Sequence, residues 1–580
     1  MSGLRNELKK AFHEGNFLQV VYEKSLGESG DQSALVEELI SMHNDGIIDA
    51  ITCFSHLENK LNIGYNFFLT RRIFEKTLPQ LNAPVKPVMD CVLHLVHEAD
   101  QDMAASSTFV PFIDFCANDP SRPEESLRQI EAAIEQLADL ITPTIVAGAR
   151  IDFRYYLNEA IRLTSYDNIE IRKRAVYSLG RIQYPQDSEL YDSAIACLEL
   201  SVAKEIDDHL LGNLIRSAFS LYIYDKSKED RAIALINNAL SKGGNYSLHA
   251  ASELVGFYFN DIPESLLDSL FNYLRRVRPE NKRTLYNIEH GIIKLINCND
   301  PTKGIEFIEA ILTANQGQIS METFDMVIRK IHNNINVLNK LMTRWFLRGN
   351  RILCEGIRAI VNKNRHHCIK LEIDPSELIS KDQLYIIFLA RKAIGYLFLT
   401  PITVVSVIIS LMHNTNEDGT IQKLSELLLD PLLINFPGKV KDYLMEKAES
   451  EAGKIKSTIE TAIKAFDEYL RDLESTGVIT ELHPTQTQRN AYRRHFSQLM
   501  LESFKKAEEE SVLLSIVSRS ILLYGRKSID YVYGPDGKPN RVEIPLHSHG
   551  TEMEFPRLEK IDCFGLNYMI QIWRAEQIKT

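Results

Sequence analysis

The chain has 580 residues, of which 44% are hydrophobic and 25% are charged, a balance typical of a globular protein and not of a disordered one. The formal net charge of -12 excludes nonspecific binding of nucleic acid over the whole surface, but it leaves room for a local basic patch. At this length the chain must divide into domains or grow as a repeat array.

The N-terminus predicts no secretory signal, because the residues from Met1 to Glu7 carry charges in place of an apolar segment. The eight cysteines are scattered without a CxxC pair, which predicts neither a disulfide framework nor a zinc ribbon. We therefore expect a reducing compartment, the cytoplasm, and no cofactor.

Short helices are predicted over most of the chain. Apolar residues recur at helical spacing between turn signals such as Asp119-Pro120 and Asp300-Pro301, and sustained strand alternation begins only at about residue 527. We therefore predict an all-α protein with an N-terminal helical domain over residues 1–150 and helical repeats over residues 151–437.

The clearest repeat unit runs from Asp167 to Ile182. Its apolar residues lie at i, i+4, i+8 and i+11 and so share one side of a helix: Ile171, Ala175, Leu179 and Ile182. The segment resembles the second helix of a HEAT or armadillo-like repeat, with an aspartate in the turn, an apolar residue before arginine, then alanine and a Leu-Gly end. The resemblance implies an α-solenoid of stacked helix pairs.

Weaker echoes of this unit follow it. From Ala175 the steps to Ala218, Ala251 and Gly291 are 43, 33 and 40 residues, close to the roughly 40-residue period of such arrays. Two further echoes lie near Gly356 and Gly395. An irregular HEAT-like α-solenoid is the predicted fold, and an irregular helical bundle is the alternative.

One segment has the length of a membrane span. The twenty residues from Ala393 to Met412 carry no charge, but Thr400-Pro401 stands in their middle. Proline would break an interior helix, whereas it suits the first position of a new helix with Thr400 as N-cap. We therefore predict two buried helices and no membrane span.

Beyond Pro437-Gly438 the pattern predicts a long antiparallel helical hairpin over residues 438–525. Apolar residues spaced three and four apart favour one long helix from about Lys439 to Leu473. Its exposed apolar side needs a partner, and the next long helix, from about Gln486 to Tyr524, is the nearest candidate.

The last segment, residues 526–580, predicts a small α/β cap. Ile529, Tyr531 and Tyr533 alternate before a turn, and the alternation resumes at Val542 and Ile544, which is typical of a β-hairpin. A final helix is expected near Phe564 to Ala575.

The most unusual feature is a basic segment between Arg329 and Lys370 with a single acid, Glu355. Its formal charge of +9 leaves the rest of the chain at -21. Concentrated arginine suits phosphate or carboxylate recognition, because the planar guanidinium donates paired hydrogen bonds. The basic residues are Arg329, Lys330, Lys340, Arg344, Arg348, Arg351, Arg358, Lys363, Arg365 and Lys370.

A continuous helix would present Arg344, Arg348 and Arg351 as one basic edge, unless Gly349 breaks it. Trp345 and Phe346 are then available for packing or stacking. A second basic cluster about two repeats earlier would line the same solenoid surface: Arg275, Arg276, Arg278, Lys282 and Arg283. The alternative is that these charges pair with acids of neighbouring units.

A third candidate surface combines arginines with aromatic side chains that can stack on bases or anchor a protein contact: Arg489, Tyr492, Arg493, Arg494 and Phe496. The alternative is a seam of the helical hairpin with solvated arginines. A weak candidate metal site lies in the C-terminal tail, where imidazoles and carboxylates are grouped: His547, His549, Glu552 and Glu554. The alternative is a solvated strand face.

We expect a non-catalytic scaffold or adaptor that mediates protein–protein interaction within a larger assembly, since solenoids offer long surfaces to partners. The alternative is a nucleic-acid-binding module that uses the Arg329–Lys370 segment on DNA or RNA. A third hypothesis is a metal-dependent enzyme centred on the C-terminal His/Glu cluster.

Overall fold

The computed structural model describes residues 2–26, 32–60, 64–100, 102, 104–185, 188–297, 301–364, 368–477, 484–509, 511, 527–533, 539–545 and 554–578. They fall into two compact units, Met1–Lys330 and Ile331–Thr580. Nearly all of the regular structure is helical, as the sequence predicts. The predicted boundaries after residues 150, 437 and 525 stay predictions.

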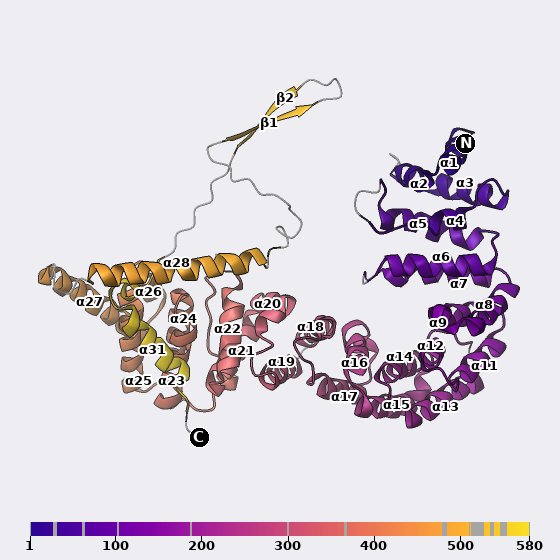
Figure 1. Ribbon diagram of the computed structural model, residues 1–580. Coiled ribbons are helices and arrows are strands. Elements are labelled where there is room, and N and C mark those ends of the chain that lie inside the picture. The colour runs from indigo at the N-terminus through magenta and orange to yellow at the C-terminus, as the bar shows by residue number, and fades with distance from the viewer. Residues whose placement is uncertain are drawn as a thin grey trace. The chain divides into compact units, whose positions relative to one another are not determined.

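The first unit consists of consecutive short helices (Figure 1). Their bounds are α1 Ser2–Glu14, α2 Phe17–Ser25, α3 Ser33–Asn44, α4 Ala50–Phe54, α5 Phe67–Thr77, α6 Val85–Glu98, α7 Phe109–Ala117, α8 Ser121–Ala132, α9 Ile134–Leu137, α10 Ile141–Ala149, α11 Phe153–Leu163, α12 Ile169–Leu179, α13 Ser188–Lys204, α14 Asp208–Tyr224, α15 Glu229–Lys242, α16 Asn245–Phe257, α17 Glu264–Leu274, α18 Lys282–Ile296 and α19 Thr302–Ala314. Helix α20, Asp325–His332, crosses the unit boundary.

From α11 onward these helices form two rows. Helices α12, α14, α16 and α18 pack each on the next, and we call them the first row. Helices α11, α13, α15 and α17 form the second row, which follows along one side of the first (Figure 1). The short connections make consecutive helices neighbours, so that each pair buries its apolar sides together.

Helix α12 shows why the sequence folds this way. The Asn168 side chain accepts the backbone N–H of Glu170 at 2.8 Å and so caps the helix. The predicted apolar row, Ile171, Ala175, Leu179 and Ile182, is buried to at least 99%. Full burial of each large member contributes about 1.5–3 kcal/mol. The predicted echoes in α14, α16 and α18 are buried in the same manner.

Gly180 ends α12 at a close contact between α12 and α14. A Cβ added at this position would lie 2.5 Å from the Cα of Ser217 in α14. No side chain fits there without moving the backbone, which accounts for the Leu-Gly end of the unit.

The second unit contains the remaining described elements. Their bounds are α21 Ile335–Arg348, α22 Arg351–Val361, α23 Gln383–Leu397, α24 Pro401–His413, α25 Asp418–Leu427, α26 Lys439–Ser450, α27 Gly453–Thr476, α28 Gln486–Glu509, β1 Lys527–Tyr533, β2 Pro539–Pro545, α30 Arg557–Ile561 and α31 Cys563–Ala575. The two strands pair antiparallel, with Lys527 opposite Pro545 and Tyr533 opposite Pro539.

The uncharged segment from Ala393 to Met412 is divided between α23 and α24, as predicted. Pro401 is the first residue of α24, and the Thr400 hydroxyl donates to the Leu397 carbonyl at 2.9 Å instead of capping the new helix. Within the described part of the chain, no helix is long and apolar enough to cross a bilayer.

The helix predicted from Lys439 to Leu473 is two helices in the structure. Helix α26 ends at Ser450, and α27 begins at Gly453, whose φ of +60° is accessible to glycine. Helix α26 then packs against α27, and α27 buries Ile459 and Phe466. None of the residues of α28 is buried, so the predicted seam with α27 does not form along it.

A cluster of polar contacts fastens the end of α31 to α23. The ammonium of Lys392, a fully buried side chain, donates to the Arg574 carbonyl at 2.6 Å, and the Arg574 guanidinium donates to the Gly395 carbonyl at 2.6 Å. Arg391 pairs with Glu576 at 2.9 Å. Burial lowers the pKa of Lys392, because desolvation disfavours its charged form. We call this cluster the C-terminal clasp.

Candidate functional site

The exposed side of the first row is a candidate surface of the first unit. On each helix it consists of residues three or four apart that are exposed or half-buried, because the other sides pack against neighbours. We call it the first-row face: Glu170, Lys173, Tyr177, Arg181; His209, Asn213, Arg216, Ser220; Tyr246, His249, Glu253, Phe257; Arg283, Tyr286, His290 and Lys294.

Side-chain contacts connect this face from helix to helix. The Asn213 amide donates to the Lys173 carbonyl at 3.0 Å, which joins α14 to α12. Arg216 donates to Glu253 at 2.5 Å, which joins α14 to α16. His249 lies 3.3 Å from both Glu253 and the hydroxyl of Thr284 in α18. The face is therefore one connected surface.

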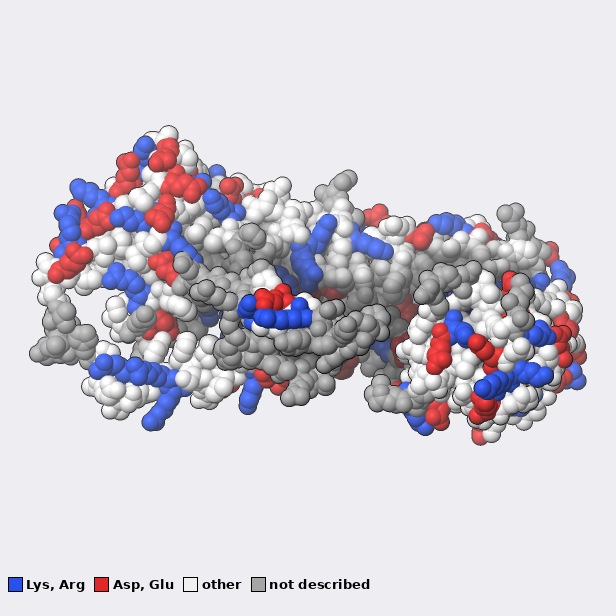
Figure 2. Space-filling view, turned by 90° about the horizontal axis from the view of Figure 1, so that it is seen from above, with Lys and Arg blue, Asp and Glu red and all other residues white. Residues whose placement is uncertain are grey.

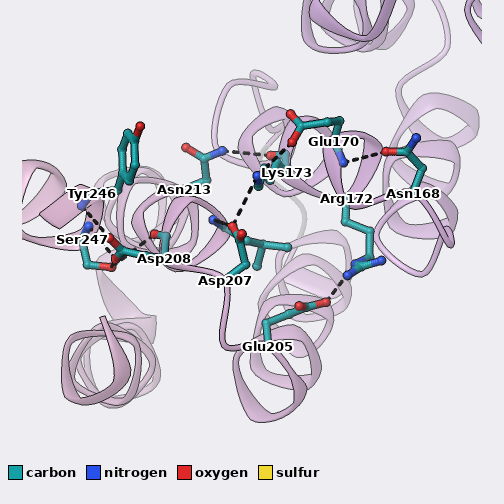
Figure 3. A network of polar contacts seen from close by, with 11 residues as sticks. Asn168, Glu170, Arg172, Lys173, Glu205, Asp207, Asp208, Asn213, Tyr246 and Ser247 are labelled. Atoms are coloured by element: carbon teal, nitrogen blue, oxygen red, sulfur yellow. Dashed lines mark hydrogen bonds and ion pairs between the residues drawn. The ribbon is translucent and has the colours of Figure 1, made fainter. Parts of the chain in front are cut away.

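A network beneath this face fixes the spacing of the helices (Figure 3). The Asp208 carboxylate accepts the backbone N–H of Gly244, Tyr246 and Ser247 at 2.6, 2.7 and 3.1 Å, and the Ser247 hydroxyl at 2.7 Å. The first residue of α14 thus caps α16. Burial alone would raise the pKa of Asp208, but these hydrogen bonds outweigh it and hold the pKa below its usual value.

The same network joins α12 to the connection between α13 and α14. Arg172 pairs with Glu205 at 2.9 Å, and Lys173 lies 3.5 Å from Asp207, the N-cap of α14 (Figure 3). These contacts hold α12 against the start of α14.

A hollow of about 230 Å³ opens on the face between α12, α14 and α16. Tyr177, Arg181, Phe257 and Tyr258 are among the residues that line it. Arg181 donates through Nε to the Tyr177 hydroxyl at 2.9 Å and lies 5.0 Å from the centre of that ring. An apolar side chain fits against such aromatic walls, and a neighbouring carboxylate suits the guanidinium.

Glu253 is the most strongly perturbed carboxylate of the face. Its burial would raise the pKa, but hydrogen bonds from His249 and Arg216 outweigh that effect and lower the pKa to about 2. Its negative charge is therefore paired with Arg216 within the face.

Low pH is expected to lower the free energy of unfolding of the helices that form the face, because Glu253 becomes protonated. The pKa is about 2 in the folded chain and ~4.3 in an unfolded one, so the stabilisation is complete above ~pH 5 and is lost as the pH falls toward 2. At pH 3 about 2 kcal/mol of it is expected to be gone. Thermal unfolding should show Glu253→Gln less stable than the native chain at pH 7, with a smaller difference at pH 4.

The matched control is Glu264→Gln, since the Glu264 side chain is 84% exposed. It should unfold like the native chain at both pH values. A Glu253→Gln deficit of the same size at pH 7 and pH 4 would contradict the assignment of the pH dependence to this carboxylate.

The basic cluster predicted at the start of α18 lies at one edge of the first-row face. All of its members are exposed: Arg275, Arg276, Arg278, Lys282 and Arg283. Arg276 lies 5.0 Å from the centre of the Tyr273 ring. Lys282 and Arg283 line a cavity of about 710 Å³ together with Asp100 and Asp102, so acids accompany them.

The basic segment from Arg329 to Lys370 is divided between the two units. Arg329 and Lys330 end the first unit, the later members belong to the second, and Arg365 lies outside the described residues. Gly349, with a φ of +62°, ends α21, so Arg351 begins a separate helix and the continuous basic edge is not formed. Trp345 and Phe346 are fully buried and pack in the core.

Several charges of this segment pair with acids, two of them on their own helix and two with acids farther along the chain. The pairs are Arg329–Asp325 at 2.9 Å, Lys340–Glu377 at 3.8 Å, Arg358–Glu355 at 2.6 Å and Lys370–Glu446 at 3.5 Å. Arg344, Arg348 and Lys363 also have interactions within the chain. On the side of the molecule shown in Figure 2, basic and acidic side chains are interspersed in many places.

The third predicted surface lies on α28, where Arg489, Tyr492, Arg493, Arg494 and Phe496 are all exposed. The rings of Tyr492 and Phe496 stack, with centroids 6.3 Å apart and an interplanar angle of 17°. The structure thus brings these aromatic and basic side chains together on one helix.

The weak metal cluster is only partly described, because His547, His549 and Glu552 lie outside the described residues. Glu554 has a structural contact: its carboxylate accepts the backbone N–H of Gly438 and Lys439 at 2.8 and 2.9 Å, at the start of α26. Within the described ranges, no group of three or more His, Cys, Asp or Glu side chains could hold a metal ion.

Sequence reasoning did not identify the first-row face. It named the buried residues of each echo but not the exposed neighbours three and four positions away, such as Arg216, Glu253 and Phe257. These exposed neighbours could have been predicted from the sequence, since the exposed side of a helix follows from the positions of its buried residues. Comparison of the chain with models of protein families and with curated proteins gave no match.

Proposed function

We propose that the chain is a non-catalytic scaffold, built as a HEAT-like α-solenoid, that binds a segment of a protein partner along the first-row face. The observation that carries the proposal is the set of exposed aromatic side chains on consecutive helices. Tyr246, Phe257 and Tyr286 expose 50%, 59% and 53% of their surface on α16 and α18. Aromatic side chains supply much of the binding energy of protein interfaces.

The charges of the face favour an acidic partner segment. Lys173 pairs with Glu170 at 2.9 Å, and Arg216 pairs with Glu253 at 2.5 Å, so the acids of the face are neutralised within it. Arg181, an exposed residue that lines the aromatic hollow, donates through Nε to the Tyr177 hydroxyl. An apolar side chain next to a carboxylate has the complementary chemistry.

The second unit, which contains α26, α27 and α28 in place of the predicted long hairpin, would then dock a second component of the assembly. The repeat-like first unit supports a long binding surface, and the second unit supports attachment to other parts.

The experiment is purification of the tagged full chain from its native host, with and without nuclease, followed by identification of what is bound. Phe257→Ala and Arg181→Glu are expected to lose a protein partner that survives nuclease. The control is Leu200→Ala, which removes a side chain of similar exposure, 63% against 59%, from α13 in the second row. Retention of every partner by the two face variants would overturn the proposal.

Nucleic acid provides the competing outcome. If DNA or RNA co-purifies and is lost when Arg344, Arg348 and Arg358 are changed to glutamate, the basic segment is the functional surface. Binding would then weaken steeply with salt, because each neutralised phosphate releases counterions.

A further inference from the structure

The hollow between α12, α14 and α16 combines aromatic walls with two guanidinium groups. Phe257 and Tyr258 line it from the end of α16 and are 59% and 46% exposed. Phe219 lines it from α14, and its ring centre lies 5.6 Å from that of Tyr258. Arg181, just after α12, and Arg216 of α14 also line it. The same hollow therefore offers contacts to an apolar ring and to an anion.

The volume of the hollow limits the ligand. A cavity of ~150 Å³ is large enough to bind benzene. The hollow measures about 230 Å³, so a benzene-sized ring leaves about 80 Å³, the room of roughly two to three water molecules. This remainder accommodates a compact group attached to the ring, whereas a nucleotide adds a ribose between its base and its phosphate. The volume therefore favours one aromatic ring that carries a small anionic group.

The two guanidinium groups keep hydrogen-bond donors for such an anion. Within the described residues, the hydrogen bonds of Arg181 use only Nε, which donates to the Tyr177 hydroxyl at 2.9 Å. Arg216 donates through Nε to Glu253 at 2.5 Å and through Nη1 to Asn213 at 3.3 Å. Both Nη atoms of Arg181 and Nη2 of Arg216 can therefore donate to a ligand, and they come from two different helices of the row.

The number of donors favours a phosphate over a carboxylate. The two guanidiniums share the hollow with one carboxylate, Glu253, so the formal charge of the three groups is +1. Glu253 is itself paired with Arg216 and lies 3.3 Å from His249. A carboxylate has two oxygens, which one guanidinium satisfies, whereas a phosphate monoester presents three acceptor oxygens and can engage both arginines.

We propose that the hollow binds the side chain of a phosphorylated tyrosine in the protein partner. Its ring packs against Phe257 and Tyr258, and its phosphate accepts hydrogen bonds from Arg181 and Arg216. This one side chain supplies both the apolar group and the negative charge that suit the first-row face. The inference rests on the proposed function, because it names the group of the partner that this face recognises. Phosphorylation of the partner then increases its affinity.

Ligand-observed NMR of the full chain with N-acetyl-phosphotyrosine amide tests the inference. This probe should bind about tenfold more tightly than either N-acetyl-tyrosine amide or inorganic phosphate, because only the probe engages the aromatic walls and the guanidiniums together. Arg181→Gln should weaken the probe about tenfold and leave tyrosine amide unchanged, and Phe257→Ala should weaken both. The matched control is Arg154→Gln, which removes the same charge from an exposed position of α11 and should bind like the native chain.

Three results would overturn the inference: a probe that binds no better than inorganic phosphate, adenosine monophosphate that binds more tightly than the probe, or Arg181→Gln and Arg154→Gln with equal effects. The failure of the proposed function is a different result. A co-purified partner that is lost from the Phe257→Ala chain, but stays bound to the native chain after phosphatase treatment, leaves the scaffold function standing and overturns the phosphotyrosine alone. Retention of every partner by the face variants overturns the proposed function.

Discussion

Asp208→Ala is expected to lower the free energy of local unfolding of the α14–α16 pair by about 3–4 kcal/mol. The Asp208 carboxylate accepts three backbone N–H groups and one hydroxyl at the start of α16. A hydrogen bond to a charged acceptor contributes ~1.5–3 kcal/mol, and its loss also leaves the donors without a partner. Hydrogen exchange of peptides that cover the first turns of α16 measures the effect.

The neighbouring carboxylate is the control. Asp207 caps its own helix through one hydrogen bond, from Leu210 at 2.9 Å, so Asp207→Ala should cost only ~1 kcal/mol. Asp208→Asn keeps one acceptor oxygen and should fall between the two. Equal loss of protection in Asp207→Ala and Asp208→Ala would contradict the account that the Asp208 carboxylate of α14 stabilises the start of α16 through its several hydrogen bonds.

Gly180→Val is expected to force α12 away from α14 and to lower local stability by about 3 kcal/mol, at the upper end of overpacking effects. The added Cβ would meet Ser217 at its Cα, 2.5 Å away, and at its Oγ, 2.7 Å away. The φ of Gly180 is -84°, which any residue adopts, so the loss arises from the contact alone. A lower midpoint of thermal unfolding and faster proteolysis between α12 and α14 are the expected readouts.

Gly212→Ala tests the same effect at a longer contact distance in the first row, where a smaller loss of stability is expected. Its Cβ would lie 3.1 Å from the Tyr246 carbonyl oxygen, a contact that small shifts relieve. Alanine inside α14 also gains ~1 kcal/mol of helix propensity over glycine. The two terms nearly cancel, so the variant should unfold within ~1 kcal/mol of the native chain. A destabilisation as large as that of Gly180→Val would contradict the account based on contact distance.

A helix could be predicted from the sequence wherever residues within a few positions determine where it begins or which side of it is buried. Pro401 fixes the start of α24, and the apolar period of Ile171 to Ile182 fixes the buried side of α12, because both effects act within a few residues. The break before Gly453 could not be predicted. Glu451 and Ala452 are good helix formers, and the packing of α27 against α25 and α26 overrides their propensity.

The candidate surfaces depended on contacts that a sequence does not contain. Lys370 pairs with Glu446 and Lys340 with Glu377, acids far along the chain that neutralise part of the basic segment. Trp345 stands beside arginines in the sequence, yet its ring points into the core. The exposed side of each first-row helix was implied by its period, but its alignment with the next helix follows only from stacking.

The C-terminal clasp has a consequence for synthesis on the ribosome. Lys392 and Arg574 are separated by 182 positions, so the buried ammonium has no acceptor from α31 until that helix has been made. At ~5–20 residues per second, this delay is on the order of 10–40 s. The first unit can fold while it leaves the ribosome. Helix α23, by contrast, keeps an unpaired charge and an exposed apolar side until α31 has been synthesised. During that interval the nascent second unit is the part of the chain that most needs a chaperone.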